Sequence, residues 1–408
     1  MQLQFIKKHI FSVSLLLFIL SALVGLLMRY QMVFPIQLFE HKNLLQGHSH
    51  VAFLGWGYFA TIGAVFYAFV PTEKWNNRIY KTSLIITILS VFLMLFSFPI
   101  LGYKAFSIAL LVIFGISSYF LSFKLLSDIN KSNTSTKFVR FGIYYYLISS
   151  LATWFLVYVI IVHGKSNLYY NTVYFYLHFL YNGFFVFTLF GLLFFVLEKQ
   201  QIVISEKYKK LFFIYLNVAC IPSYLLSILW SGVSSLYFVV GFIAAILQVF
   251  AVYYLLKIVI QASQQWKWSK ISELLFYVSF TSFLIKIGSQ LASSFPYFVE
   301  KSIALKPFFI IGYIHLFTLG FMSTLLFFIL NEIKKIEIQT VISKSGIVLF
   351  LIGVFCTELI LFYQGFAVIY KLPLINNQPM LMLVFSGVIV MGLFFLIVNH
   401  FKTKKIKH

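Results

Sequence analysis

Apolar stretches, each long enough to cross a lipid bilayer as an α-helix, recur from one end of this 408-residue chain to the other. A membrane-spanning helix needs about 20 predominantly apolar residues, and about twelve stretches meet that criterion. Apolar residues make up 61% of the chain and charged residues 10%. The sequence therefore predicts an all-α, polytopic membrane protein that forms a single integral membrane domain over residues 1–408. The predicted helices cover residues 10–34, 44–70, 82–101, 104–126, 138–163, 171–197, 209–230, 233–258, 271–295, 306–331, 344–370 and 378–401.

A short motif, a histidine followed five residues later by a glycine, lies near the start of three predicted helices. Its copies are HVAFLGWG from His50, HFLYNGFF from His178 and HLFTLGFM from His315. These helices are the second, sixth and tenth, so the motif returns every four helices. This spacing predicts three pseudo-repeated groups of four. We expect each glycine to permit close helix packing, because it lies about 140° around the helix from its histidine.

The three motif histidines are predicted to lie at one depth in the membrane. Each follows the expected start of its helix by about six to nine residues, which places it roughly 9–14 Å below the outer end. Buried histidines are costly in lipid and are therefore candidates for function. Equal depth favours one shared centre. The alternative is a neutral imidazole that only forms a hydrogen bond to a neighbouring helix.

His48 and His50 are two residues apart, about 200° around a helix, so their side chains point to opposite sides. The face of His50 continues through the small residues Gly57, Thr61 and Ala64. Small residues let a neighbouring helix or a flat macrocycle approach closely. We therefore predict that His50 serves the central site. His48 would contact a second metal, a haem propionate or only a neighbouring helix.

The basic residues that give the chain its net charge of +21 are distributed as the positive-inside rule describes. If both termini are cytoplasmic, most lysines and arginines fall in inner segments. The sequence thus predicts a multi-pass protein of the bacterial inner (plasma) membrane, with the lipid bilayer as its partner and no nucleic-acid binding. The outer ends and loops hold the smaller share of basic residues: Arg29, Lys42, Lys104, Lys165, Lys301, Lys306 and Lys371.

Imidazoles facing each other at one depth suit the two axial positions of a low-spin b-type haem. The predicted axial ligands are His50 and His315, and Arg29 is a candidate partner for a haem propionate. Imidazole also binds copper. For copper or another second metal the candidates are His178 and His48.

Two further charged residues, Lys286 and Glu358, fall inside predicted helices. Lys286 lies near the level of the histidines, and Glu358 lies near mid-membrane. Either can serve a proton relay or a substrate site. Equally, a lysine near a boundary can extend its ammonium group to the interface, and a glutamic acid can be held neutral by a hydrogen bond.

The arrangement resembles the haem–copper oxidase subunit I superfamily, which has ligand histidines on helices two, six and ten. The stretch HVAFLGWGYFATIGAVFYAFVP from His50 looks like the second helix of nitric oxide reductases and cbb3-type oxidases, where a low-spin haem histidine precedes a tyrosine and a closing proline. His178 falls where helix six has a copper ligand. Tyr313 and His315 match the family's His-x-His on helix ten, with Tyr313 in place of the high-spin haem ligand. Because helix seven has no histidine, the resemblance implies a low-spin haem without a complete binuclear centre.

NnrS-type haem–copper membrane proteins share shorter motifs with this chain. These motifs are HSHVAFLG from His48 and HLFTLG from His315. The resemblance to these proteins implies electron transfer or a role in nitric oxide or metal stress.

Three functions remain open on the sequence. The first is a haem-binding membrane protein of electron transfer or stress response. The second is a functional terminal oxidase or nitric oxide reductase subunit, an oxidoreductase. Both imply a redox partner protein or partner subunits. The third is a transporter or scaffold without a cofactor.

Overall fold

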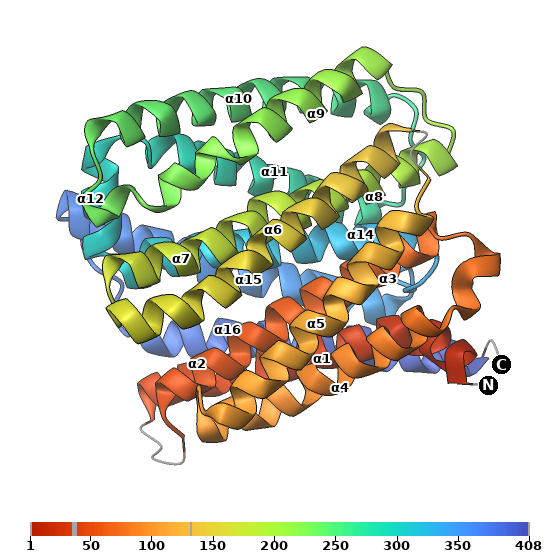
Figure 1. Cartoon of the computed structure of the whole chain (residues 1–408), viewed down its shortest axis with the longest axis horizontal. Helices are drawn as coiled ribbons and strands as arrows, with labels where there is room; N and C mark the ends of the chain where they lie inside the picture. Colours follow the sequence, from red (N-terminus) through yellow and green to blue (C-terminus); the bar gives the residue numbers. More distant parts are fainter. Residues whose placement is uncertain (1, 35–38, 131–132, 407–408) are drawn as a thin grey trace. The chain divides into compact units, whose positions relative to one another are not determined.

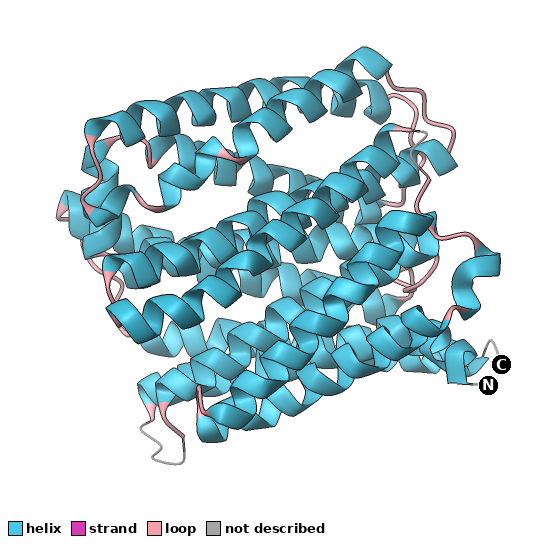
Figure 2. Cartoon of the chain, in the orientation of Figure 1, coloured by secondary structure: helices cyan, strands magenta, loops and turns pink. Residues whose placement is uncertain are grey.

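The computed structural model describes residues 2–34, 39–130 and 133–406. Within these ranges the chain consists of helices joined by loops, and no strand is present (Figure 2). The chain divides into two compact units. Unit 1 comprises Met1–Ile129 and Leu326–His408, and unit 2 comprises Asn130–Leu325. The prediction of an all-α fold is confirmed.

Eleven helices among the described residues are long and apolar enough to cross a membrane. Many large apolar side chains on them are exposed, which suits a surface that meets lipid rather than water. The chain is therefore a polytopic membrane protein. Examples of these exposed side chains are Leu16, Phe92, Phe120, Leu151, Ile161, Phe355 and Phe394.

The first group of four helices lies wholly in unit 1 (Figure 1). Its second helix has three parts, which are α-helical, π-helical and α-helical in turn. A short 3₁₀ helix, η2 (Thr72–Asn76), precedes the third helix. The members are α1 (Gln2–Val33), the second helix formed by α2 (His41–His50), η1 (Val51–Gly57) and α3 (Tyr58–Phe69), then α4 (Arg78–Leu101) and α5 (Ala105–Asp128).

The second group lies in unit 2 and repeats this plan. Its members are α6 (Thr134–His163), the second helix formed by α7 (Asn167–His178), η3 (Phe179–Phe185) and α8 (Val186–Lys199), then α9 (Glu206–Cys220) with the 3₁₀ helices η4 (Pro222–Ser227) and η5 (Leu229–Ser231), and α10 (Ser235–Ser263).

The third group begins in unit 2 and ends in unit 1, with the boundary inside α14. A short helix, α12 (Pro296–Ala304), precedes its second helix. The members are α11 (Lys270–Ala292), the second helix formed by α13 (Lys306–His315), η6 (Leu316–Ser323) and α14 (Thr324–Glu332), then α15 (Val341–Tyr370) and α16 (Gln378–Ile406).

Equivalent helices pack in the same way in the three groups. The first helix packs against the π-helical part of the second in the pairs α1–η1, α6–η3 and α11–η6. The third and fourth helices pack together in the pairs α4–α5, α9–α10 and α15–α16. The predicted organisation in three groups of four is thus present in the packing as well as in the sequence.

In the structure the seventh predicted helix, 209–230, is interrupted. Its α-helix, α9, ends at Cys220, and two 3₁₀ segments follow. Pro222 explains the break, because proline lacks an N–H and its ring clashes with the carbonyl four residues earlier. A membrane-buried helix that breaks leaves carbonyl groups that other groups must satisfy.

The start of α1 and the end of α16 lie side by side in unit 1. The Ser12 Oγ and the His400 Nε2 are 2.9 Å apart and form a hydrogen bond. Both ends of the described chain therefore lie at the same end of unit 1. Which side of the membrane this end faces stays a prediction.

The second helix of each group is the most buried. In the membrane-spanning part of His41–Phe69, Asn167–Lys199 and Lys306–Glu332, 78%, 89% and 78% of the residues are buried, against 50% or less in the other spans. Aromatic rings fill the space around these helices, for example Phe18 of α1, which stacks on Trp56 with 4.5 Å between ring centroids. The second helices are therefore the ones that present side chains to the interior.

Candidate functional site

His50, His178 and His315 occupy equivalent positions. Each is the last residue of an α-helical segment and is followed at once by a π-helix. In a π-helix a backbone N–H bonds to the carbonyl five residues earlier, as the Tyr58 N–H does to the Phe53 carbonyl. Such segments are rare in proteins overall, but those that occur are often found at functional sites. Sequence reasoning missed all three, although the repeated histidine–glycine motif marks where each one lies.

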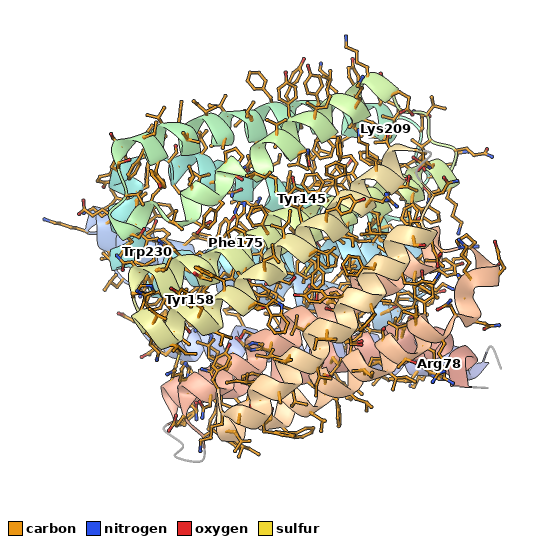
Figure 3. All side chains as sticks on the ribbon, in the orientation of Figure 1. Arg78, Tyr145, Tyr158, Phe175, Lys209 and Trp230 are labelled. Carbon is orange, nitrogen blue, oxygen red and sulfur yellow. The ribbon has the colours of Figure 1, made fainter. Side chains whose placement is uncertain are left out.

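The motif glycines face neighbouring helices rather than the histidines. A Cβ at Gly183 would lie 2.4 Å from the Tyr145 Cβ, so only glycine fits between η3 and α6. Figure 3 labels Tyr145 on α6. The expectation that these glycines permit close packing is confirmed. The three contacts are Gly55 with Leu17 of α1, Gly183 with Tyr145 of α6, and Gly320 with Ser282 of α11.

The His50 imidazole is fixed on three sides within unit 1. Its Nδ1 donates a hydrogen bond to the Gln46 carbonyl, 2.7 Å away, one turn earlier in α2. The ring stacks on Phe98 of α4 at 4.4 Å between centroids and 8° between planes. The Nε2 lies 3.2 Å from the Tyr103 hydroxyl. Since Nδ1 holds the proton, the lone pair of His50 is on Nε2.

His48 points away from His50 and toward α1. Its Nδ1 donates to the Ser21 carbonyl at 2.8 Å. Its ring lies against the backbone of α1, because a Cβ at Gly25 would be 2.9 Å from the His48 Cε1. Of the contacts predicted for His48, the structure therefore shows the one with a neighbouring helix.

His178 has hydrogen-bond partners on both ring nitrogens. Its Nε2 donates to the Cys220 carbonyl at 2.8 Å, and its Nδ1 accepts from the Asn182 amide at 3.1 Å. The Cys220 carbonyl is available because α9 ends there, and it also accepts from the Ser223 hydroxyl. In this arrangement the Nδ1 lone pair of His178 is directed at the Asn182 amide.

His315 lies in unit 2 at the same level as His178. The Tyr181 and Phe317 rings stack at 5.0 Å, and further along both helices Phe190 contacts Phe321. The two second helices of unit 2 thus run parallel, with their histidines within about one helical turn of the same level. Tyr313, two residues before His315, interacts electrostatically with Tyr181.

His50 belongs to unit 1 and His315 to unit 2. Their pairing on one haem stays a prediction. Arg29 lies in unit 1, where it interacts electrostatically with Glu358 of α15 and with His48. The structure therefore brings together three of the predicted site residues on the side of α2 that faces away from His50.

Lys286 lies in unit 2 on α11, and its side chain is 2% exposed. It interacts electrostatically with His178 and with the Cys220 thiol. The prediction that Lys286 lies at the histidine level agrees with the packing of α11 against η6. There Gly320 faces Ser282 and the Phe321 carbonyl accepts from the Ser279 hydroxyl at 3.0 Å.

Within the described ranges, no three or more histidine, cysteine, aspartate or glutamate side chains are arranged to hold a metal ion. Comparison of the chain with models of known protein families and with curated proteins gives no match. The fold and the interior together define a polytopic α-helical membrane protein in which three helices present histidines at π-helical junctions.

Proposed function

We propose that this membrane protein binds a b-type haem, with His50 as an axial ligand, and works in electron transfer or in the response to nitric oxide or metal stress. The observation that supports this proposal best is the fixed orientation of His50. A metal-binding histidine usually donates its second ring N–H to a carbonyl or carboxylate, which sets the tautomer and the direction of the free lone pair. His50 has this arrangement through Gln46.

The neighbouring histidine supplies an internal comparison. His48 has the same type of Nδ1 bond, but its ring is packed against the α1 backbone at Gly25. A haem iron at the His50 Nε2 would have to displace the Tyr103 hydroxyl, 3.2 Å away on an exposed side chain, whereas the His48 ring lies against helix backbone. This difference favours His50 over His48 as the haem ligand.

His315 is our proposed second axial ligand, because it holds the equivalent place in the third group. The proposal does not include copper at His178. His178 has a buried hydrogen-bond partner on each nitrogen, and among the described residues it belongs to no group of three or more histidine, cysteine, aspartate or glutamate side chains that could hold a metal ion. The prediction of copper thus has no support from the arrangement of His178.

The test is the visible absorption spectrum of the purified full-length protein, recorded with a pyridine haemochrome assay and metal analysis on the same sample. We expect a low-spin, bis-imidazole b-type spectrum at about one haem per chain. His50→Ala and His315→Ala should each lose it. His41→Ala is the matched control, because His41 is exposed at the start of α2, and it should keep the spectrum.

The other outcomes identify the alternatives. A second, high-spin band that reacts with carbon monoxide would favour a terminal oxidase or nitric oxide reductase subunit. Colourless protein after expression with excess haem precursor would refute the proposal and favour a transporter or scaffold.

A further inference from the structure

A stripe of polar side chains runs along the buried face of α11. Ser279, Ser282, Lys286 and Gln290 recur at helical spacing, and they are 2%, 6%, 2% and 6% exposed. The two serines face η6, where one bonds a carbonyl and the other contacts a glycine. Lys286 and Gln290 continue the stripe to within one turn of the end of α11 at Ala292. Burying polar groups in an apolar interior is costly unless they find partners.

Lys286 has no hydrogen-bond acceptor or carboxylate at its Nζ among the described residues. Its Nζ lies over the Phe283 ring, 5.5 Å from the ring centroid. The other charged or titratable groups that act on it electrostatically are Cys220 and His178, and neither is an anionic partner of the kind a buried ammonium group needs. Among the described residues, no carboxylate therefore balances an ammonium group at this position.

Several buried amide oxygens in unit 2 have no hydrogen-bond partner among the described residues. The Gln290 Oε1, one turn after Lys286 on α11, is buried without a partner, and so is the Asn182 Oδ1 beside His178. The Gln248 Oε1 of α10 is also buried without a partner, and this side chain is 3% exposed.

The register of α10 against α11 places Gln248 at the level of Lys286. Ala245 belongs to a small apolar cluster with Leu291, whereas Leu255 lines an apolar cavity with Phe276 and Phe283. The two helices are therefore antiparallel, and Gln248, which lies between Ala245 and Leu255, falls opposite residues 286–290.

The break in α9 lies beside the same lysine. The helix stops at Cys220, whose thiol interacts with Lys286, and the chain continues as a 3₁₀ segment from Pro222. In membrane proteins, non-helical backbone at this depth is tolerated where it is buried in protein or lines a cavity, and broken helices frequently form substrate or ion sites.

We propose that unit 2 binds a small oxyanion, of the carboxylate or nitrate type, between Lys286 and the amides of Gln290 and Gln248 at the break in α9. The anion supplies the missing counter-charge, and its oxygens accept from the ammonium group and from amide groups, which can turn to donate. This site does not depend on the proposed haem.

The Cys220 thiol is buried, so N-ethylmaleimide reaches it only when the structure around the break in α9 opens locally, and its modification rate reports on that opening. The chain has two cysteines, so a Cys356→Ser background leaves Cys220 as the single thiol. We would measure the rate at which N-ethylmaleimide modifies Cys220 in the full-length protein in detergent, with sodium acetate or sodium nitrate against sodium gluconate at equal ionic strength. We expect acetate or nitrate to slow modification at least threefold and saturably, and the larger gluconate to have no effect.

Variants connect this protection to Lys286. Protection should be lost in Lys286→Gln and kept in Lys286→Arg. It should also be kept in Lys270→Gln, which removes an exposed lysine from the same helix. Gln290→Glu retains the lysine and places a carboxylate one turn away, so it should abolish protection even if Lys286→Gln does not fold.

Three results would overturn the proposal: equal modification rates in all three salts, equal protection by gluconate, or full protection in Gln290→Glu. Haem absorbance recorded on the same samples is expected to be unchanged. A failure of this site is therefore distinguishable from a failure of the proposed haem function.

Discussion

Replacing the motif glycines with alanine should destabilise the protein in an order that the structure sets. At Gly183 the new Cβ would lie 2.4 Å from the Tyr145 Cβ and 2.7 Å from the Tyr145 Cγ. The Tyr145 Cβ is fixed to the α6 backbone, so no side-chain rotation relieves the overlap. Helix α6 and η3 would have to separate by about 1 Å, and overpacking of this kind costs roughly 1–3 kcal/mol.

The other glycines should respond more weakly. At Gly320 the nearest atom, 2.6 Å away, is the Ser282 Oγ, which can rotate, and the Ser282 Cβ is 3.2 Å away. At Gly55 the nearest atom is the Leu17 Cβ at 3.1 Å. A contact of this length can relax by a few tenths of an ångström, so we expect a cost of about 1 kcal/mol or less at both positions.

Gly288 is the matched control, because it is also in a helix of unit 2 and a Cβ there meets nothing within 4 Å. Gly288→Ala should be neutral or stabilise the protein by about 0.4–1 kcal/mol, because alanine reduces the conformational entropy of the unfolded chain. The assay is thermal unfolding in detergent, and the measured quantity is the fraction of protein that remains monodisperse after heating. The reasoning would be refuted if Gly183→Ala unfolded at or above the wild-type temperature, or if Gly55→Ala were the most damaging change.

Three other predictions concern polar side chains in the interior. His48→Ala should keep the haem spectrum that His50→Ala loses, and the opposite result in paired absorption spectra would show that the wrong face of α2 was assigned. Asp128→Ala should lower the free energy of unfolding by about 2–3 kcal/mol and Tyr80→Phe by about 1 kcal/mol. The Asp128 carboxylate, whose side chain is 2% exposed, lies 2.8 Å from the Lys124 ammonium, 3.1 Å from the Lys74 ammonium and 2.9 Å from the Tyr80 hydroxyl. Equal thermal shifts for the two variants would contradict this ranking. Purified, metal-supplemented protein should not reduce oxygen or nitric oxide at respiratory rates with an artificial electron donor, because among the described residues no three histidine, cysteine, aspartate or glutamate side chains are arranged to hold a second metal. Rapid turnover would show that an open site exists.

Much of the candidate site could be located from the sequence. The histidine–glycine motif identified the three second helices and the role of the glycines in packing. The two-residue spacing of His48 and His50 predicted their opposite directions, which the hydrogen bonds to Ser21 and Gln46 show. These inferences succeeded because they depend on helical periodicity, which is a local property of the chain.

The π-helices could not be derived in the same way. A π-helix differs from an α-helix by one residue in its hydrogen-bond spacing, and no residue type specifies it. In η6 the Ser279 hydroxyl of another helix bonds the Phe321 carbonyl, and the Ser323 hydroxyl bonds the Thr318 carbonyl five residues earlier. Part of the hydrogen bonding that accompanies η6 thus comes from a different segment of the chain.

The sequence by itself determined that this chain is an all-α membrane protein in three groups of four helices. The reason is that long apolar stretches in lipid must satisfy their backbone hydrogen bonds internally. Tertiary structure decided what each histidine contacts. His178 bonds a carbonyl 42 residues away, which is left without a helical partner by the break at Pro222, whereas the His50 ring stacks on Phe98 and its Nε2 faces the Tyr103 hydroxyl. The imidazoles of similar motifs have different surroundings because Cys220, Phe98 and Tyr103 belong to other segments of the chain, and only packing brings them together.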